Sequence, residues 1–374
     1  MTSAAKPGVT SPADRFGPLL PESATAISGT FDTIFDWSYD SGRDQVLSLY
    51  EKGKDKQWNA TTRLDWDHEV DPDNPLGMPD DFVWIAGTPL WERLPERERA
   101  LCRLHTAGWL YSQFLHGEQG ALVCAAKIVQ IVPDLDAKFY ASTQVVDEAR
   151  HVEAYRRYLR EKIGVSYPVT SALKGVLTDV ISDQRWDVTC LGMQVLIEGL
   201  AIAAFSIQRD YMRDPLAKSF NALILADEAR HVAFGRLALR DYYRELTSAE
   251  LREREEFAAE TCWALRDRFF GEDMWRTLDV GDPDECVEYA RKSPALREFR
   301  RRLFRRIVPT LKDINLLGPR LRADLAKMGV LRFSELDNDE LLADDDRRAA
   351  EVERAELAAR ADQVHGTIAA GRES

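Results

Sequence analysis

The same six residues, Asp-Glu-Ala-Arg-His-Val, occur twice in this chain of 374 residues, beginning at Asp147 and again at Asp227. A single glutamate precedes each copy by the same distance, with Glu118 before the first copy and Glu198 before the second. One constant offset relates the two halves, since 198 − 118 and 227 − 147 both equal 80. The chain therefore contains a duplicated pair of segments whose register is preserved.

Each duplicated half is expected to form an antiparallel helical hairpin. From Glu118 the helical pattern runs about 14 residues to a break at Pro133, which spans roughly 20 Å at the usual rise per residue. The returning helix covers the same distance before it reaches Glu148. Within each returning helix, Glu and His stand at positions i and i+3 and share one face. Two such hairpins packed as a bundle would bring four glutamates and two histidines together at one depth.

This set of side chains is typical of a carboxylate-bridged pair of metal ions. One Glu from each of two helices and Glu-x-x-His from each of the other two form the ligand set of di-iron and di-manganese sites in helical bundles. Carboxylates can bridge two metals, and imidazole adds one neutral donor to each metal while leaving positions open for dioxygen. The candidate metal ligands are Glu118, Glu148, His151, Glu198, Glu228 and His231.

The alternative is a helix pair duplicated for packing, with the motif facing solvent. The segment LGMQVLIEGLAIAAF argues against this alternative, since Glu198 stands alone in an apolar stretch. Carboxylates buried without cations would cost many kcal/mol or be forced to protonate. A metal site accounts for Glu118 and Glu198, whereas packing alone does not.

The other charged residues of the motif are candidates for holding the ligands in place. A histidine that binds a metal usually donates its other ring N–H to a carboxylate. We expect Asp147 to pair with His231, and Asp227 with His151, across the bundle. The side chains expected to hold these aspartates are Arg150 and Arg230. Ordinary surface ion pairs are the alternative for both arginines.

Long helical patterns dominate the chain. They run roughly over residues 95–131, 135–162, 170–182, 184–212, 215–246, 248–270 and 295–313. Strand signals are nearly absent, because β-branched residues do not alternate with polar ones over any useful length. Helices of about thirty residues are typical of bundles. The predicted fold is all-α, a four-helix bundle with additional flanking helices.

Three regions are expected along the chain. Residues 1–40 are rich in Pro, Ser, Ala and Gly and predict a flexible N-terminal arm. Residues 41–317 predict the helical domain, with its four-helix metal-binding core at about 95–246. Residues 318–374 predict a C-terminal helical tail, whose mixed charges in DDDRRAAEVERAELAARAD are typical of a solvated helix or of one that faces a partner.

Charge and cysteine content bear on partners and location. The chain has 50 Lys and Arg against 63 Asp and Glu, and its net charge of -13 argues against nucleic acid and anionic membranes as partners. Five cysteines without a CxxC pair suit a reducing compartment. The N-terminus has no signal-peptide pattern, and no apolar run approaches the ~20 residues of a membrane-spanning helix. We expect a soluble, cytoplasmic protein.

At the motif residues the chain resembles the ferritin-like di-iron oxygenases and oxidases, including the p-aminobenzoate N-oxygenase group. Two copies of Glu-x28-Asp-Glu-x-x-His carry the resemblance, which is specific over about residues 95–246. It implies a ferritin-like bundle, two iron ions per chain with an Mn/Fe pair as a variant, and O2 as co-substrate. It also implies a hydrophobic pocket beside the metals and the oxidation of a small organic substrate through a peroxo-di-iron intermediate.

One position departs from the pattern of that group. The arylamine N-oxygenases carry an additional His ligand one turn before the glutamate of the second motif, where this chain has Ile224. Whether nitrogen or carbon is oxygenated is therefore left open. The candidate pocket or redox residues near the ligands are Tyr155, Ile224, Ile202 and Gln194.

Two alternative functions are compatible with the same ligands. A radical-generating subunit similar to the ribonucleotide reductase small subunit would use Tyr155, which lies one turn after His151, where that family has its radical tyrosine. Against it stand the equal ligand spacings of the two halves and a C-terminal segment, HGTIAAGRES, without tyrosine. A ferroxidase or iron-binding protein is the second alternative, although storage ferritins are short chains.

The expected partners follow from the chemistry. The substrate is a small organic molecule, and electrons would come from it or from a separate reductase or ferredoxin, because the sequence has no flavin or nicotinamide fingerprint. We expect a homodimer by analogy with other helical di-metal proteins.

Overall fold

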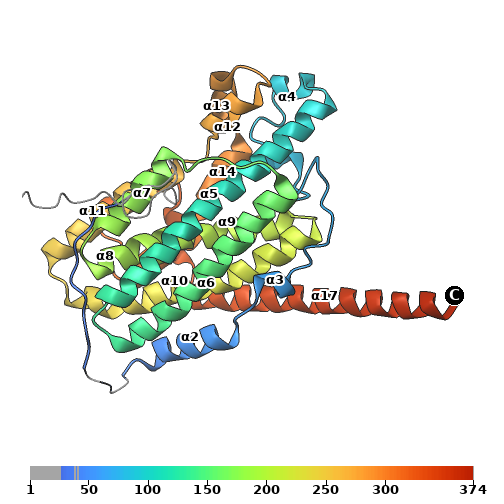
Figure 1. Ribbon diagram of the computed structural model, residues 1–374. Coiled ribbons are helices and arrows are strands. Elements are labelled where there is room, and N and C mark those ends of the chain that lie inside the picture. The colour runs from blue at the N-terminus through green and yellow to red at the C-terminus, as the bar shows by residue number, and fades with distance from the viewer. Residues whose placement is uncertain (1–26, 38, 40–41, 374) are drawn as a thin grey trace, which may run out of the picture.

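The computed structural model describes residues 27–37, 39 and 42–373. Most of the arm predicted for residues 1–40 lies outside the described residues. Every regular element in the described part is a helix, which confirms the predicted all-α class. Figure 1 shows long helices side by side in a bundle, with shorter helices around it.

Two helical hairpins form the bundle. The first joins α5 (Glu96–Ile131) to α6 (Leu135–Tyr158). The second joins a continuous helix, made of α8 (Trp186–Cys190), η4 (Leu191–Ile197) and α9 (Glu198–Tyr211), to α10 (Pro215–Glu245). Asp134 caps α6 and Asp214 caps α10, each accepting from backbone N–H groups of the first helical turn. The equivalent caps retain the duplicated register.

The first helix of the second hairpin is irregular just before a predicted ligand. Its middle segment η4 is π-helical and ends directly before Glu198. A π-helical segment inserts an additional residue into the turn and is frequent at functional sites. Sequence analysis predicted one regular helix over 184–212 and did not identify this segment.

Shorter helices cover the bundle. Helix α2 (Asp44–Asp55) packs against α6 and α10. Between residues 59 and 90 three short helices begin. The other flanking elements are α3 (Ala60–Arg63), η2 (Asp80–Phe82), α4 (Pro89–Arg93), η3 (Leu159–Ile163), α7 (Ser171–Ser182), α11 (Ser248–Arg266), α12 (Glu272–Leu278) and α13 (Pro283–Lys292).

The prediction of a single helix over 295–313 is wrong. The segment divides into α14 (Pro294–Arg302), η5 (Leu303–Arg305) and α15 (Ile307–Asp313). Pro309 supplies the physical reason, because proline has no N–H to donate and its ring clashes with the carbonyl group one turn earlier.

The C-terminal part is helical. It consists of α16 (Pro319–Met328), η6 (Leu331–Glu335) and α17 (Asn338–Glu373). The start of α17 packs against α10, with Leu341 buried and Asp345 in an ion pair with Arg306. In Figure 1 the rest of α17 extends past the bundle.

One helix has the length and apolar character of a membrane span, although sequence analysis found no such run. It is Trp186–Tyr211, with a mean hydropathy of 1.8 over its most apolar window. Inside the bundle, 83% of that window is buried. A core helix that packs on all sides has the same composition. Length and apolar character alone are therefore weak evidence for a membrane span.

Candidate metal centre

Six acidic and imidazole side chains meet in the middle of the bundle. One group, whose ligand atoms lie within 4.8 Å of one another, consists of Glu118, Glu148, His151 and Glu228. A second group under the same limit consists of Glu148, Glu198 and His231. Each of the six side chains is at most 5% exposed. Because the groups share Glu148, the six predicted ligands form one cluster with two centres.

The imidazoles mark these two centres. His151 Nδ1 lies 3.1 Å from Glu118 Oε2, 3.3 Å from Glu148 Oε2 and 3.2 Å from Glu228 Oε1. His231 Nδ1 lies 3.1 Å from Glu148 Oε1 and 3.6 Å from Glu228 Oε1. Glu148 and Glu228 therefore reach both imidazoles and stand where bridging carboxylates would. The other two glutamates each belong to a single centre.

Several of the expected ligand atoms have no hydrogen-bond partner within the described part of the chain. They are Glu148 Oε2, Glu198 Oε2, both carboxylate oxygens of Glu228, and His231 Nδ1. A buried polar atom left unpaired costs about 1–3 kcal/mol, so such atoms are uncommon in a core unless a ligand satisfies them.

The charge of the cluster points in the same direction. Together with Asp147 and Asp227, the four glutamates make six buried carboxylates, which face the two buried guanidinium groups of Arg150 and Arg230. With both imidazoles neutral, four negative charges remain, and two divalent cations would neutralise them. Carboxylates with one imidazole per metal suit iron and manganese. The residues therefore fit a di-iron centre.

In the metal-free protein, protons replace these cations. Burial raises the pKa of Glu118 and Glu198 well above the ordinary carboxyl value, and the charge of Glu228 raises both further. Burial alone would lower the pKa of His151, but Glu118 and Asp227 raise it well above its usual value. Metal binding must displace such protons.

Each imidazole directs its second nitrogen to an aspartate of the other hairpin. His151 Nε2 lies 3.1 Å from Asp227 Oδ2, and His231 Nε2 lies 3.2 Å from Asp147 Oδ2. These are the crossed pairs expected from the sequence. An Nε2–H that donates to a carboxylate fixes the ring and leaves Nδ1 as the ligand atom.

The two arginines connect these aspartates. Arg150 Nη2 donates to Asp147 Oδ1 at 2.5 Å and to Asp227 Oδ2 at 3.0 Å, and Arg230 Nη2 donates to Asp227 Oδ1. Burial would raise the pKa of Asp227, but His151 and the two arginines hold it well below its usual value. Arg150 is 6% exposed and Arg230 is 8% exposed, so the alternative of ordinary surface ion pairs is wrong.

Two residues that sequence analysis missed also hold the aspartates. Gln57 Nε2 donates to Asp147 Oδ1 at 2.8 Å, and Trp58 Nε1 donates to Asp227 Oδ2 at 2.8 Å. The Trp58 ring also stacks on His151, with ring centroids 6.5 Å apart. Both residues follow the end of α2, outside the repeat, and no spacing in the sequence connects them with it.

Gln144 was missed as well, although the repeat could have identified it. Its Nε2 donates to Glu198 Oε1 at 2.7 Å and to Glu148 Oε1 at 3.1 Å, and its Oε1 accepts from Gln194 Nε2 at 3.3 Å. Gln144 precedes Glu148 by one helical turn. The constant offset between the two halves makes it the counterpart of Ile224 in the second half.

The opposite side of the cluster is apolar and aromatic. Phe114 lies one turn before Glu118 on α5, and Tyr155 lies one turn after His151 on α6. The Phe114 ring packs against Phe205 with centroids 4.9 Å apart and against Tyr155 with centroids 6.0 Å apart. The metal cluster therefore has a polar side, formed by the two glutamines, and an aromatic side.

The four predicted pocket or redox residues have different surroundings. Ile202 lines a small cavity of about 30 Å³ together with Ala229 and Val232. Tyr155, Ile224 and Gln194 are fully buried. Among the described residues, nothing pairs with the Tyr155 hydroxyl group.

The other described histidine side chains are engaged away from the cluster. His68 Nε2 lies 2.8 Å from Asp214 Oδ2. His105 Nδ1 lies 2.5 Å from the hydroxyl group of Tyr167, and His116 Nε2 lies 2.9 Å from the backbone oxygen of the same residue. None of these three side chains replaces the additional ligand missing at position 224.

Comparison with known proteins identifies the family. Residues 40–315 match the family described as P-aminobenzoate N-oxygenase AurF. Among solved structures, an R2-like ligand-binding oxidase variant with an anaerobically reconstituted Mn/Fe cofactor is 17% identical, with 75% of this chain and 95% of that chain covered and a TM-score of 0.46. A second variant of that description is also 17% identical, with 74% and 98% covered and a TM-score of 0.46.

No curated protein matches the sequence significantly. The family match spans most of the chain and includes both copies of the ligand motif. The chain therefore belongs to the p-aminobenzoate N-oxygenase family and is a di-iron oxidoreductase.

Proposed function

We propose that this protein uses two iron ions and O2 to oxidise a small, mainly apolar organic substrate, by oxygenation at nitrogen or carbon. The observation that carries the proposal is the buried cluster of four glutamates and two histidines, whose unpaired atoms and excess negative charge call for two cations. Membership of an N-oxygenase family supports the same class of reaction.

The protein's own contribution is to hold the ligands and to exclude water. Dioxygen activation is the chemistry that a pair of iron ions supplies when bound in such a ligand set. The crossed pairs of aspartate and histidine fix both imidazole rings, and Arg150 and Arg230 form ion pairs with the aspartates. Gln144 orients Glu148 and Glu198 by donating to both. Burial of all these groups strengthens each interaction.

The aromatic side of the cluster supports an approach by an apolar substrate. Phe114, Tyr155 and Phe205 present ring surface there, and Ile224 occupies the position of the additional imidazole in the arylamine N-oxygenases. Isoleucine cannot bind a metal, so the protein would supply one ligand fewer here than in the arylamine N-oxygenases. We propose that this position faces O2 or substrate.

The decisive experiment combines metal analysis with rapid mixing. The protein is loaded anaerobically with Fe(II), desalted and analysed for iron, then mixed with O2 while its absorption spectrum is recorded from milliseconds to minutes. We expect about two irons per chain and a broad visible band that decays faster when a substrate is present. Iron content near zero, with no change upon adding O2, would refute the proposal. Loading with Mn(II) and Fe(II) together tests the Mn/Fe variant.

The same experiment separates the alternatives. A sharp tyrosyl-radical signal that is lost in Tyr155→Phe would favour the radical-generating subunit. Rapid oxidation of many more than two irons per chain, without substrate, would favour a ferroxidase. The radical signal is not expected, because the Tyr155 hydroxyl group has no hydrogen-bond partner among the described residues through which it could lose a proton.

We further propose a separate reductase or ferredoxin as electron donor, a homodimeric assembly and a cytoplasmic location. Light scattering after size-exclusion chromatography would give the mass of the particle, and a monomer would refute the dimer. Turnover with a chemical reductant in place of a protein partner would test the need for external electrons.

A further inference from the structure

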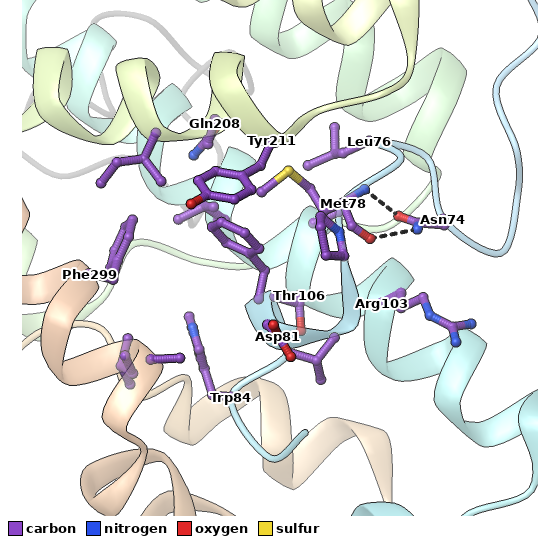
Figure 2. Close-up of a pocket in the computed structure, with 18 of the residues that line it drawn as sticks. Asn74, Leu76, Met78, Asp81, Trp84, Arg103, Thr106, Gln208, Tyr211 and Phe299 are labelled. Atoms are coloured by element: carbon purple, nitrogen blue, oxygen red, sulfur yellow. Dashed lines mark hydrogen bonds between the residues drawn. The ribbon is translucent and has the colours of Figure 1, made fainter. Parts of the chain in front are cut away.

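A second feature of the bundle is a cavity at the end opposite the loop of the first hairpin. Its volume is about 250 Å³, and its walls come from the segment 74–84, the first half of α5, the end of α9, and α14. Figure 2 shows Tyr211, Met78, Trp84 and Phe299 around this space. Most of the lining is apolar, and the volume is slightly below the range of about 300–1,000 Å³ for small-molecule sites.

Two neutral polar groups in the wall lack partners within the described residues. Gln208 is 1% exposed, and neither its Nε2 nor its Oε1 has a hydrogen-bond partner; it lies beside Tyr211 in Figure 2. The hydroxyl group of Thr106 is unpaired as well. An unpaired amide in a buried wall costs about 1–3 kcal/mol, which a ligand can recover by pairing with it.

The two arginines of the wall are already paired, and Asp81, a further charged residue of the wall, is exposed to solvent. Arg103 lies 2.6 Å from Asp80 Oδ1 and 2.7 Å from Glu96 Oε1, and Arg302 Nε lies 3.3 Å from Glu298 Oε1. The buried groups left for a ligand are therefore a neutral amide, which both donates and accepts, and a hydroxyl. An uncharged molecule matches this wall, because a buried charge without a counter-charge is costly.

The cavity lies on the aromatic side of the metal cluster. Leu110 lines it, and Phe114 and Glu118 follow on the same face of α5 at successive i+4 positions, so Glu118 is about 12 Å further along the helix. On α9, Phe205 precedes Gln208 by one turn and packs against Phe114. One layer of aromatic rings therefore separates the cavity from the proposed metal ligands.

We infer that this cavity is the first binding site of the substrate, and that it takes a small, uncharged, mainly apolar molecule with one group that both donates and accepts hydrogen bonds. Gln208 is the specificity residue in this inference. The link to turnover rests on the proposed function, whereas binding in the cavity does not need iron. A carboxamide, a hydroxyl group or a neutral amine on a ring would pair with the Gln208 amide.

The test uses three probes that share one benzene ring and differ in its single substituent: benzamide, benzoate and toluene. Their binding is measured by calorimetry on the iron-free and the iron-loaded protein, with Gln208→Leu as the variant and Gln45→Leu, at an exposed position on α2, as the matched control. We expect benzamide to bind the parent protein better than benzoate. In Gln208→Leu its affinity should fall about tenfold, while that of toluene stays the same or rises.

Loss of the fold cannot produce this pattern. Gln208→Leu replaces an unpaired buried amide by an apolar side chain of similar size, so the free energy of unfolding should stay the same or increase. Ala295→Trp adds a second test, since Ala295 is exposed at the rim of the cavity and an indole there would obstruct its mouth. We expect all three probes to bind more weakly in this variant.

The two proposals fail in different ways. If no probe binds, or if benzamide binds equally well to the parent protein, Gln208→Leu and Ala295→Trp, the inference about the cavity is overturned even when O2 chemistry is present. If the probes behave as expected but iron and O2 cause no spectral change, the cavity remains a binding site and the proposed oxidation fails. Once a substrate is known, Gln208→Leu should raise KM and leave kcat nearly unchanged, because Gln208 does not contact the cluster.

Discussion

The two halves of the metal cluster have the same ligands but different neighbours. In the first hairpin, Phe114 and Tyr155 lie one turn outside Glu118 and His151. The constant offset between the halves makes Gln194 and Gly235 their counterparts in the second hairpin. Gln194 packs so closely on Gly235 that a Cβ there would lie 2.6 Å from Gln194 Cβ. Where the first half has the aromatic residues Phe114 and Tyr155, the second half thus has Gln194 packed against Gly235.

This difference makes the two sides of the cluster chemically distinct. The first helices of the two hairpins, α5 and the helix that ends with α9, run in opposite directions. The start of α5 and the end of α9 both line the cavity described above. The outer neighbours of the first half therefore face the cavity, and those of the second half face the other end. Both halves of the duplication therefore keep the residues of the cluster, whereas the residues beside them differ and form an aromatic side and a polar side.

The largest expected effect concerns the two kinds of glutamate. Glu148→Ala should remove nearly all iron, because Glu148 belongs to both centres, whereas Glu118→Ala should retain about one iron per chain. Iron is measured after anaerobic loading and desalting. Glu153→Ala, at an exposed position on α6, is the control and should bind two irons. Equal iron content in Glu148→Ala and Glu118→Ala would contradict the assignment of bridging and outer ligands.

The crossed pairs should be equivalent between the halves. Asp227→Asn and Asp147→Asn should each weaken iron binding about 10–100-fold, because each removes the carboxylate that fixes one imidazole. Titration against a chelator of known affinity gives the values, and Asp241→Asn at an exposed position of α10 is the control. Full affinity in Asp227→Asn would show that the pairing does not hold the ligand.

The third prediction concerns Gln144, whose replacement by isoleucine makes the two halves alike at this position. Gln144→Ile introduces the residue of the equivalent position 224 and removes the donor to Glu148 and Glu198. We expect iron affinity to fall about tenfold, since carboxylate ligands rely on such donors for orientation. The chelator titration applies again. An unchanged affinity would mean that the difference at this position serves the substrate side alone.

The glycine of the second half can be tested by stability. Gly235→Ala gains about 1 kcal/mol of helix propensity but forces a clash with Gln194 Cβ, for which overpacking costs about 1–3 kcal/mol. We expect a net loss of about 1 kcal/mol in the free energy of unfolding, measured by denaturant titration. Gly175→Ala on α7, where nothing lies within 4 Å of the added Cβ, should stabilise the protein instead. Stabilisation in both variants would contradict the close contact.

The smallest effect is expected at Tyr155, the counterpart of Gly235 in the first half. Tyr155→Phe removes a buried hydroxyl group without a partner among the described residues, so the free energy of unfolding should change by less than about 0.5 kcal/mol or rise slightly. Reaction with O2, followed by absorption, should continue at a similar rate. An abolished reaction would give Tyr155 a redox role and would favour the radical-generating alternative.

Sequence analysis identified the fold and the cluster because the motif spacing encodes both. The pattern Glu-x28-Asp-Glu-x-x-His, present once in each half, is compatible with two equal hairpins, and the helical period then aligns Glu148 with His151 and Glu228 with His231. The same repeat contained information that the analysis did not use, since it relates Gln144 to Ile224. Pro309 also marked a break in the helix predicted over 295–313.

Other features depended on contacts between segments that are distant in sequence. Gln57 and Trp58 reach the aspartates only because α2 packs across α6 and α10, and no periodicity in the chain predicts that packing. The cavity beside Gln208 likewise forms where four separate segments meet. Helical spacing determines which residues share a face of one helix, and therefore the sequence alone determined the six residues of the cluster and their bundle. Which faces meet depends on how side chains of all helices pack together, so only the tertiary structure decided the polar and aromatic sides of the cluster and the place of the cavity.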